Sequence, residues 1–369
     1  MHTLRNYSFK SFKHLRQRGM TLVELMVSIA ISGTVLAGLV AALVTTKSNF
    51  VSQRELSGIQ ENARFAIKYM GDELRAAGYA GCTKNPVIAV NAVTGAPTSW
   101  YLNNPGLQGY EYDAGINTFP TQFKADVNAN TDAIVVRRGD LTGLSVSSES
   151  GSTITVNAAH SYQIGQIFLA ASSTCDRIAV FQMSGPTNGS NNATTVSHAA
   201  TGTNTPGNCN AYYGSTGVTT CTSGTFTSTV FGGGSTLMTL HSEAYFVGTS
   251  TSDSTIPALY RDRLTYSGTA ATTVEEELVQ GVENMQILYG VDTQPAGNLD
   301  GLADQYYKAN AVPSWANVVS VRISLRMRSL YPVYNSNTAY PVFEGVTGTD
   351  GSDRYMRQYA ATTIRIRNY

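Results

Sequence analysis

The chain has 369 residues, of which only 14% are charged, with 25 Lys and Arg against 25 Asp and Glu. Five of the basic residues and no acidic one precede residue 20, so the rest of the chain has a side-chain balance of −5 with histidine neutral. This balance argues against a nucleic-acid-binding protein, whereas the length allows one large or two small domains.

The chain begins with a basic segment that is followed at once by an apolar one. Residues 1–19 contain five basic side chains, while Glu24 is the only ionisable side chain in residues 20–44. An apolar run of this length can cross the hydrocarbon layer of a membrane as a helix. The positive-inside rule then places residues 1–19 in the cytoplasm and the bulk of the chain across the membrane.

The border between the two segments differs from an ordinary signal peptide, in which a small-residue cleavage site follows the apolar region. Here the small residue, Gly19, precedes it, so cleavage after Gly19 removes the leader and leaves the apolar helix as the new N-terminus. Glu24 is then the fifth residue of the mature chain. A carboxylate at this depth in a membrane span is costly and predicts a specific pairing; a plain anchor that happens to carry Glu24 is the alternative.

The helical pattern continues beyond the apolar run. Residues 47–77 contain no proline, and apolar residues recur at steps of three or four: Ile59, Ala63, Ile67, Met70, Leu74 and Ala77. We predict one helix from Met20 to Ala77, with Gly78 and Gly81 as stops, whose second half packs on a globular head. An anchor followed by an independent helix is the alternative.

The head, residues 79–369, reads as β-rich. Little periodicity is present in residues 82–130, which we interpret as a loop region with room for one short strand. Strands are predicted at residues 131–138, 152–156, 166–170, 177–183, 236–247, 258–266, 319–328 and 362–367. In the last two the alternation is strict, and one face carries Arg322, Arg326, Arg328, Arg365 and Arg367. We expect antiparallel strands with this arginine face in solvent; docking of an acidic neighbouring subunit is the alternative.

Residues 184–235 differ in composition from the rest of the head. Thr, Ser, Gly and Asn dominate, and no apolar pattern is sustained, so little core can form from them. We predict a solvent-exposed insertion. The alternative is a variable surface that is presented to a partner or receptor.

All four cysteines, Cys82, Cys175, Cys209 and Cys221, lie beyond the apolar run, on the side that is predicted to be oxidising. An even number there favours disulfides, and no C-x-x-C spacing points to zinc. Three connectivities are possible. We favour Cys209–Cys221, which closes a short loop, together with Cys82–Cys175.

Two short motifs have structural explanations. The Asp126-x-Asn128-x-Asn130-x-Asp132 spacing resembles a calcium loop, but it has Thr131 in place of the turn glycine and no glutamate at its twelfth position, so we expect an Asn/Asp turn that enters a strand. In Arg138-Gly139-Asp140, we expect Gly139 and Asp140 to form a hairpin turn.

The chain shows no pattern of an active site. The histidines are scattered, no nucleophile or zinc-protease motif is present, and adjacent acids such as Glu276 and Glu277 are expected to be solvated. We therefore predict that the protein is not an enzyme and needs no cofactor or metal.

The N-terminal pattern, Gly19-Met20-Thr21-Leu22-Val23-Glu24-Leu25 after a basic leader, resembles the processing site of type IV prepilins and type II secretion pseudopilins. This resemblance implies that prepilin peptidase cleaves between Gly19 and Met20 and that the new amine of Met20 is N-methylated. It also implies that Glu24 pairs with the N-terminal amine of a neighbouring subunit, which supplies the counter-charge that a carboxylate in lipid needs. Met20 stands where Phe is commonest.

The C-terminal pattern sharpens the resemblance. The segment from Leu278 to Gln286, Trp315 with Val318 to Leu325, and a terminal Ile-Arg-Ile-Arg-Asn are similar to the PilW family of minor pilins, which is related to J-type pseudopilins. Together the two regions cover about 60 N-terminal and about 100 C-terminal residues. The resemblance implies an α+β pilin-like fold: a long N-terminal helix, transmembrane and then amphipathic, packed on an antiparallel β-sheet head with long loops.

The expected function is that of a minor pilin that primes assembly of a type IV pilus, with a position at its tip as a further option. The implied partners are other minor pilins and the major pilin, prepilin peptidase, the inner-membrane assembly platform and inner-membrane lipid; no nucleic acid is expected. The head would lie in the periplasm and then on the pilus. The alternatives are a J-type pseudopilin of type II secretion and a tip adhesin that acts through residues 184–235.

Overall fold

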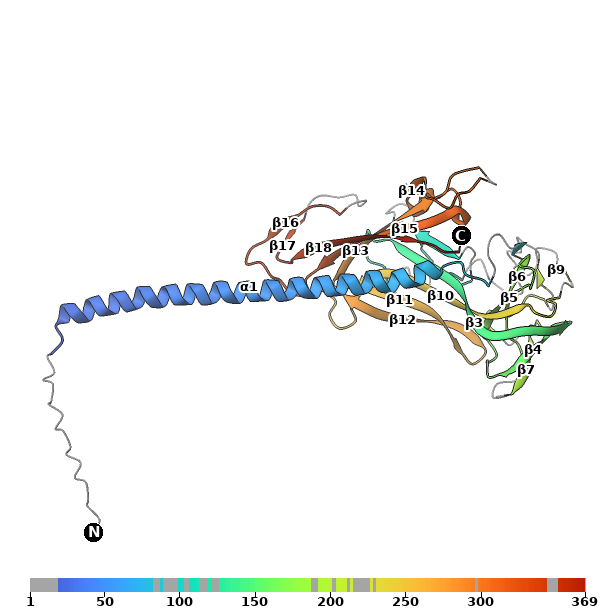
Figure 1. The fold of residues 1–369 in the computed structure, drawn as a ribbon. Helices are drawn as coiled ribbons and strands as arrows, with labels where there is room; N and C mark the ends of the chain where they lie inside the picture. The colour runs from blue at the N-terminus through green and yellow to red at the C-terminus, as the bar shows by residue number, and fades with distance from the viewer. Residues whose placement is uncertain are drawn as a thin grey trace, which may run out of the picture. The chain divides into compact units, whose positions relative to one another are not determined.

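The computed structural model describes residues 19–81, 87–88, 99–102, 106–112, 119–120, 126–186, 192–200, 204–210, 213–214, 226–227, 230–295, 298–343 and 351–368. They form one long helix and mostly antiparallel β-sheets (Figure 1), as predicted. The chain divides into two compact units, Met1–Arg54 and Glu55–Tyr369.

The helix α1 (Leu22–Ala76) belongs to both units and agrees with the predicted helix within two residues at each end. Gly78 ends it, as predicted. Its φ of +75° is strained for other residues, and its N–H donates to the carbonyl oxygen of Arg137 at 2.9 Å. An added Cβ would also lie 2.7 Å from the carbonyl oxygen of Asn368, so the backbone itself requires glycine here.

Two long antiparallel strands, β3 (Ala133–Ser150) and β10 (Thr236–Thr249), form the centre of the larger sheet. Each is long enough to pair with two further strands in succession. The other edge of β3 pairs with β2 (Leu107–Tyr110) and β4 (Thr153–His160), and that of β10 with β5 (Ile167–Ala171) and β11 (Pro257–Ser267). The outer strands are β7 (Ala193–Ser197) on β4, β6 (Arg177–Gln182) on β5, β1 (Val87–Ile88) on β6, and β12 (Ala270–Gln280) on β11.

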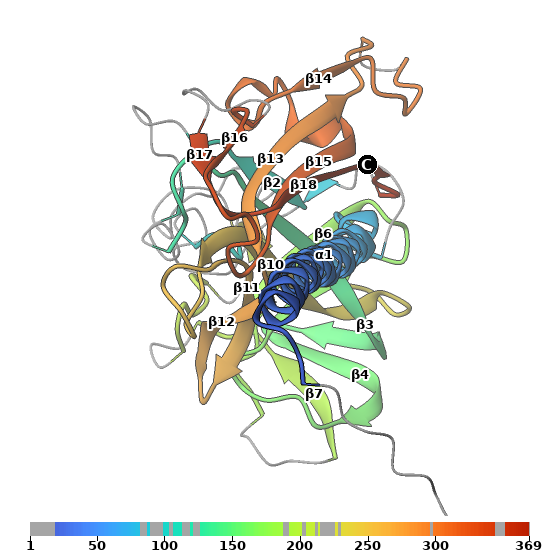
Figure 2. The same ribbon diagram turned by 90° about the vertical axis from the view of Figure 1, so that its left-hand side faces the viewer.

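A second sheet of four antiparallel strands has the order β14 (Gln305–Tyr307), β13 (Val282–Val291), β15 (Val318–Arg328) and β18 (Arg357–Arg365). The short 3₁₀ helices η1 (Ala309–Ala311) and η2 (Trp315–Asn317) lie between β14 and β15 in the chain. Two strand pairs complete the described fold: β16 (Thr338–Tyr340) with β17 (Gly351–Asp353), and β8 (Tyr213–Gly214) with β9 (Phe226–Thr227). Figure 2 shows the two main sheets from the end of α1.

Gly281 carries the chain from the larger sheet into the second one. It is the single residue between β12 and β13 and has a φ of +86°. Its N–H donates to the Pro257 carbonyl and its own carbonyl accepts from the Arg328 N–H, both at 2.7 Å. The segment from Leu278 to Gln286, which carries the C-terminal family resemblance, is therefore extended, as two strands joined at Gly281.

The main core forms where the second unit's part of α1 meets both sheets. The predicted residues Ile59, Ala63, Met70 and Leu74 are buried on one face of the helix, together with Ala66, whereas the predicted Ile67 is only partly buried. They pack with inward residues of β3, β10 and β11 and with those of β13, β15 and β18. The amphipathic pattern therefore indicated correctly that this part of the helix packs on the head.

One predicted turn in the head is wrong, and two predicted strands are longer than expected. The predicted hairpin turn at Gly139–Asp140 is absent because β3 runs through it, with Gly139 opposite Leu240 of β10. The predicted strands at residues 131–138 and 236–247 are accordingly parts of longer strands.

The Asn/Asp turn before β3 is confirmed: residues 129–130 form a turn, and Thr131 Oγ1 donates to the Asn128 carbonyl at 2.8 Å.

The arginine face is only partly in solvent. Arg322, Arg365 and Arg367 are exposed, as expected. Arg328 stacks 4.0 Å from the ring centre of Tyr355, and Arg326 forms an ion pair with Glu283 at 2.7 Å. Aromatic rings and a carboxylate that lie far apart in sequence cover these two arginines, which strand alternation alone does not indicate.

Residues 184–235 also contribute to the core, against the expectation of a solvent-exposed insertion. In the described part of this segment Val196, Tyr213 and Phe231 are buried and pack with strands β3 to β6 and β10. The Tyr213 hydroxyl donates to Glu149 at 2.9 Å, and His198 Nε2 lies 3.0 Å from the same carboxylate. A few well-placed aromatic residues are enough to anchor a segment of low overall hydrophobicity.

Candidate functional site

The predicted cleavage pair precedes the first turn of α1. Gly19 and Met20 are exposed and non-helical, and helix α1 begins two residues after Met20. A solvent-exposed peptide bond outside regular secondary structure is accessible to a protease.

Thr21 and Glu24 form a reciprocal capping box at this end of the helix. The Glu24 N–H donates to Thr21 Oγ1 at 3.2 Å, and Glu24 Oε2 accepts from the Thr21 N–H at 3.4 Å. Thr21 is thus the N-cap and Glu24 the third helical residue. The acidic side chain also lies at the positive end of the helix dipole.

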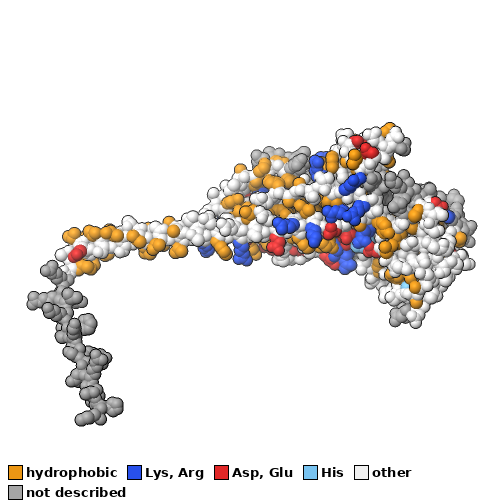
Figure 3. Space-filling model, in the orientation of Figure 1, with side chains coloured by type: hydrophobic (Ala, Val, Ile, Leu, Met, Phe, Trp, Pro, Cys, Tyr) orange, Lys and Arg blue, Asp and Glu red, His pale blue; other side chains and the backbone are white. Residues whose placement is uncertain are grey.

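The first unit's part of α1 has an apolar surface that no other described residue of this unit covers. Its large hydrophobic side chains are 38–74% exposed: Leu22, Val23, Leu25, Met26, Val27, Ile29, Ile31, Val35, Leu36, Leu39, Val40, Leu43, Val44, Phe50 and Val51. Figure 3 shows hydrophobic side chains along this stretch of the helix. By length and composition this helix is able to cross a membrane.

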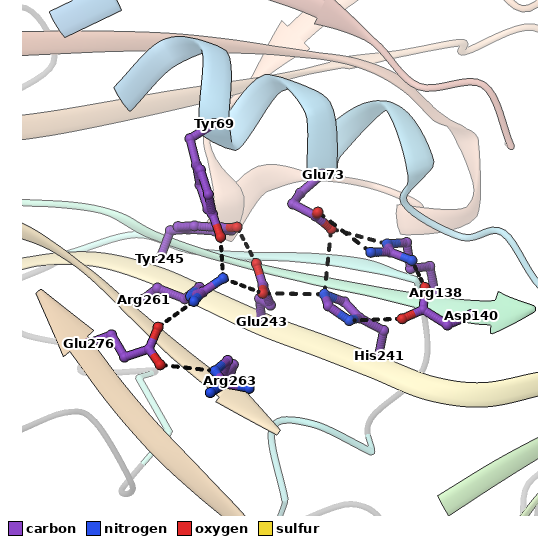
Figure 4. Close-up of polar contacts among 10 residues, drawn as sticks. All are labelled: Tyr69, Glu73, Arg138, Asp140, His241, Glu243, Tyr245, Arg261, Arg263 and Glu276. Carbon is purple, nitrogen blue, oxygen red and sulfur yellow. Dashed lines mark hydrogen bonds and ion pairs between the residues drawn. The ribbon is translucent and has the colours of Figure 1, made fainter. Parts of the chain in front are cut away.

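Within the second unit, a polar network joins α1 to β3, β10 and β11 (Figure 4). Glu73 of α1 accepts from Arg138 Nε of β3 at 3.0 Å, and Arg138 also pairs with Asp140. His241 of β10 lies between three carboxylates, with Nδ1 3.2 Å from Asp140 Oδ2 and Nε2 3.5 Å from Glu73 Oε2 and 3.3 Å from Glu243 Oε1.

The network extends from Glu243 along the sheet. Arg261 of β11 pairs with Glu243 at 3.0 Å and also contacts Glu276 of β12 and the hydroxyl of Tyr69 on α1. Glu243 is 2% exposed, and burial opposes its ionisation, but contacts with His241, Tyr245 and Arg261 outweigh this and hold its pKa below the usual value. The carboxylate therefore stays charged inside the head.

The neighbouring acids Glu276 and Glu277 are not simply solvated, as was expected. Glu276 pairs with Arg261 and with Arg263 at 3.1 Å, whereas Glu277 accepts from Ser250 Oγ at 2.9 Å and from Tyr260 at 3.1 Å. Adjacent strand residues point to opposite faces, and on each face of β12 the glutamate has hydrogen-bonding or charged side chains beside it.

A second charged group lies beside β13. Asp132 is buried, and its carboxylate accepts from the N–H of Ile287 at 2.9 Å and that of Tyr112 at 3.2 Å. Burial, and then the nearby Glu111, raise the pKa of Asp132 to about 7. Lys308 Nζ lies 2.6 Å from Glu111, and these three residues border a cavity of about 180 Å³.

The disulfide predictions fall partly outside the described residues. Cys82 and Cys221 are not described, and each belongs to one of the two favoured pairs. Cys175 and Cys209 are described, and neither is a free thiol. The pairings Cys82–Cys175 and Cys209–Cys221 stay predictions.

Sequence reasoning missed the network around His241. Glu73, His241 and Glu243 each offer one ligand atom, and these atoms lie within 4.8 Å of one another. The pattern His241-x-Glu243 within a strand places both side chains on one face, so the sequence could have indicated that these two residues lie together. Glu73 lies far away in sequence, and nothing in the pattern pairs it with them.

Comparison with known proteins agrees with this architecture. A family model described as "Type IV Pilus-assembly protein W" (PilW) matches residues 244–368, and one described as "Prokaryotic N-terminal methylation motif" matches residues 14–40. No curated protein and no solved structure gives a significant match. The first match covers the end of β10 and every described strand after it, and the second covers the capping box and the start of the apolar helix. These two matches support a type IV pilus minor pilin of the PilW type.

Proposed function

We propose that this minor pilin is made as a prepilin, cleaved after Gly19 by prepilin peptidase and N-methylated on Met20, and that it primes the assembly of a type IV pilus. The N-terminal methylation motif and the exposed, non-helical Gly19–Met20 bond support this processing. The basic leader would stay on the cytoplasmic side, and the head would lie in the periplasm.

The exposed apolar surface of α1 with Glu24 at its start carries the proposal. From Leu22 to Val44 this carboxylate is the only ionisable side chain. Apolar side chains on this scale need lipid or neighbouring helices. A subunit that leaves lipid for a pilus keeps its apolar contacts, and Glu24 then pairs with the N-terminal ammonium of a neighbouring subunit.

The head supports a structural role, and we propose no catalytic one. Its partners would be other minor pilins, the major pilin and the inner-membrane assembly platform. A position at the pilus tip is a further part of the proposal. The family match to PilW supports a pilus over a secretion pseudopilus.

Intact-mass analysis of the membrane-extracted protein tests the processing. Cells with prepilin peptidase should yield a chain without residues 1–19 and with one added methyl group, and cells without it should yield the full chain. A Glu24→Ala variant should be cleaved yet fail to enter pili, and Glu24→Gln separates loss of charge from loss of side-chain volume. An uncleaved wild-type chain, or a cut after the apolar run, would refute the prepilin assignment.

A deletion strain tests the role in assembly. We expect it to lose surface pili and twitching, with exoprotein secretion intact. Loss of secretion with normal pili would assign the protein to a type II pseudopilus instead. A strain that lacks only residues 187–191, 201–203 and 215–220 tests the adhesin alternative, because the buried anchors Val196, Tyr213 and Phe231 and the cysteine Cys221 remain. Normal piliation with lost attachment would support an adhesive role.

We also propose the disulfides Cys82–Cys175 and Cys209–Cys221. The second would close a loop of about a dozen residues, which stabilises by roughly 3 kcal/mol in the chain-entropy model. Peptide mapping without reduction tests both. A cross-linked Cys175–Cys209 peptide would contradict both pairings at once.

A further inference from the structure

The cluster of Glu73, His241 and Glu243 has the composition and spacing of a metal site. Glu73 comes from α1, whereas His241 and Glu243 are alternate residues on one face of β10. Figure 4 shows the three side chains converging. Their ligand atoms, one from each residue, lie within 4.8 Å of one another, and all three residues belong to the second unit.

The ring of His241 places Nε2 in this cluster. On the opposite side of the ring, Nδ1 lies 3.2 Å from Asp140 Oδ2. Nε2 faces Glu73 Oε2 at 3.5 Å and Glu243 Oε1 at 3.3 Å. Nε2 is buried, and among the described residues it has no contact with hydrogen-bond geometry. A metal-bound histidine usually contacts a carboxylate through its other ring nitrogen, and that contact fixes the orientation of the ring.

Charge in the cluster favours an added cation. Three carboxylates, those of Glu73, Asp140 and Glu243, surround the ring of His241. Two guanidinium groups, those of Arg138 and Arg261, contact these carboxylates. The carboxylates therefore outnumber the guanidinium groups beside them, and a surrounding rich in carboxylate oxygens suits a bound cation.

The distances fit a small tetrahedral ion. Zinc bonds of about 2.0–2.1 Å at tetrahedral angles place neighbouring ligand atoms about 3.3 Å apart. Nε2 lies 3.3 Å from Glu243 Oε1 and 3.5 Å from Glu73 Oε2. Arg138 and Arg261 contact the same carboxylates, so they can hold them in place.

We propose that Glu73, His241 and Glu243 bind a first-row divalent cation, with zinc as the best fit and a water molecule as the fourth ligand. Imidazole with two carboxylates suits zinc, whereas calcium and magnesium prefer oxygen ligands alone. The bound ion would cross-link α1 to β10, so it would stabilise the packing of the C-terminal part of α1 against the larger sheet.

The test uses the mature full-length protein in detergent, purified without a polyhistidine tag and stripped with a chelator. Zinc titration should give one ion per chain and raise the Tm by about 4 °C or more when zinc is well above its Kd. Calcium and magnesium at the same concentrations should leave the Tm unchanged. Cobalt should give the visible absorption bands of a tetrahedral ion.

Variants assign the ligands. His241→Gln and Glu243→Gln should abolish the zinc-dependent Tm shift. Asp140→Asn keeps all three ligands and should bind zinc 10- to 100-fold more weakly, so it remains informative if the other variants fold poorly. His160→Gln, a histidine on β4 outside the cluster, is the control and should bind as the wild type does. Zinc binding that survives in His241→Gln would overturn the proposal, as would a Tm that responds to pH but not to zinc.

Discussion

Thr21 and Glu24 hold each other at the first turn of α1: Thr21 Oγ1 accepts from the Glu24 N–H at 3.2 Å, and the Glu24 carboxylate accepts from the Thr21 N–H at 3.4 Å. The residue that is proposed to pair with a neighbouring subunit therefore also caps its own helix. Cleavage after Gly19 leaves this box intact, because both residues belong to the mature chain. The carboxylate is thus positioned before assembly begins.

Thr21→Ala should lower the incorporation of this protein into pili without preventing its cleavage. The substitution removes the N-cap acceptor, at a cost of about 1 kcal/mol, and leaves the Glu24 side chain less restricted. Intact mass reports cleavage, and immunoblots of sheared pili report incorporation. Thr21→Ser keeps the hydroxyl and should behave as the wild type; equal defects in both variants would show that the cap is not the cause.

Glu283→Ala should destabilise the head by roughly 3 kcal/mol. Glu283 pairs with Arg326 of β15 and Arg357 of β18, both at 2.7 Å, and all three side chains are at most 14% exposed. Removing the carboxylate leaves two buried guanidinium groups with less compensation. The free energy of unfolding in urea measures the loss. Asp72→Ala, which breaks the exposed Asp72–Arg75 pair, is the control and should cost under about 1 kcal/mol.

The buried carboxyl of Asp132 should make the head less stable as the pH rises through neutrality. Its pKa is about 7 in the folded protein against 3.8 as the ordinary value, so the folded state holds a proton that the unfolded state has released. This contribution is fully present below about pH 4 and is lost as the pH rises to about 7, with a slope of at most roughly 1.4 kcal/mol per pH unit.

Asp132→Asn isolates this effect. The variant cannot ionise at this position, so its Tm should fall less than that of the wild type between pH 5 and pH 8. Glu111 and Lys308, which border the same cavity, remain in both proteins. So does Asp262, whose pKa burial raises to about 6. Parallel Tm curves for the two proteins would rule out Asp132 as the titrating group.

Local patterns were sufficient for the long helix and for most strands. Spacing at Ile59, Ala63 and Met70 indicated the buried face of α1, and alternation from Val319 to Arg328 indicated β15. Both signals are periodicities within one element, set by the geometry of that element alone. The capping box at Thr21 and Glu24 follows a local rule as well, since its two residues are three apart.

Pairings between distant segments were not predictable in this way. The contact of Glu73 with Arg138 and His241 depends on how α1 lies on β3 and β10, and no spacing in the chain encodes it. The same holds for Arg326 and Glu283. Alternation placed Arg326 in solvent, and no local pattern pairs it with Glu283. Gly139 was taken for a turn because Gly-Asp favours turns locally, but pairing with β10 overrides that preference.

Gly281→Ala should destabilise the head, because Gly281 turns the chain between the two sheets. At its φ of +86° an alanine is strained, and the added Cβ would lie 2.7 Å from the carbonyl oxygen of Arg328. We expect a loss of about 2 kcal/mol or more, measured by urea unfolding, because both the backbone and the β13–β15 pairing must shift. Gly58→Ala is the matched control: Gly58 lies in α1 with nothing within 4 Å of an added Cβ, so the change should stabilise the helix by about 0.5–1 kcal/mol. If both variants unfold at the wild-type urea concentration, the corner tolerates a side chain and glycine is not required for the turn.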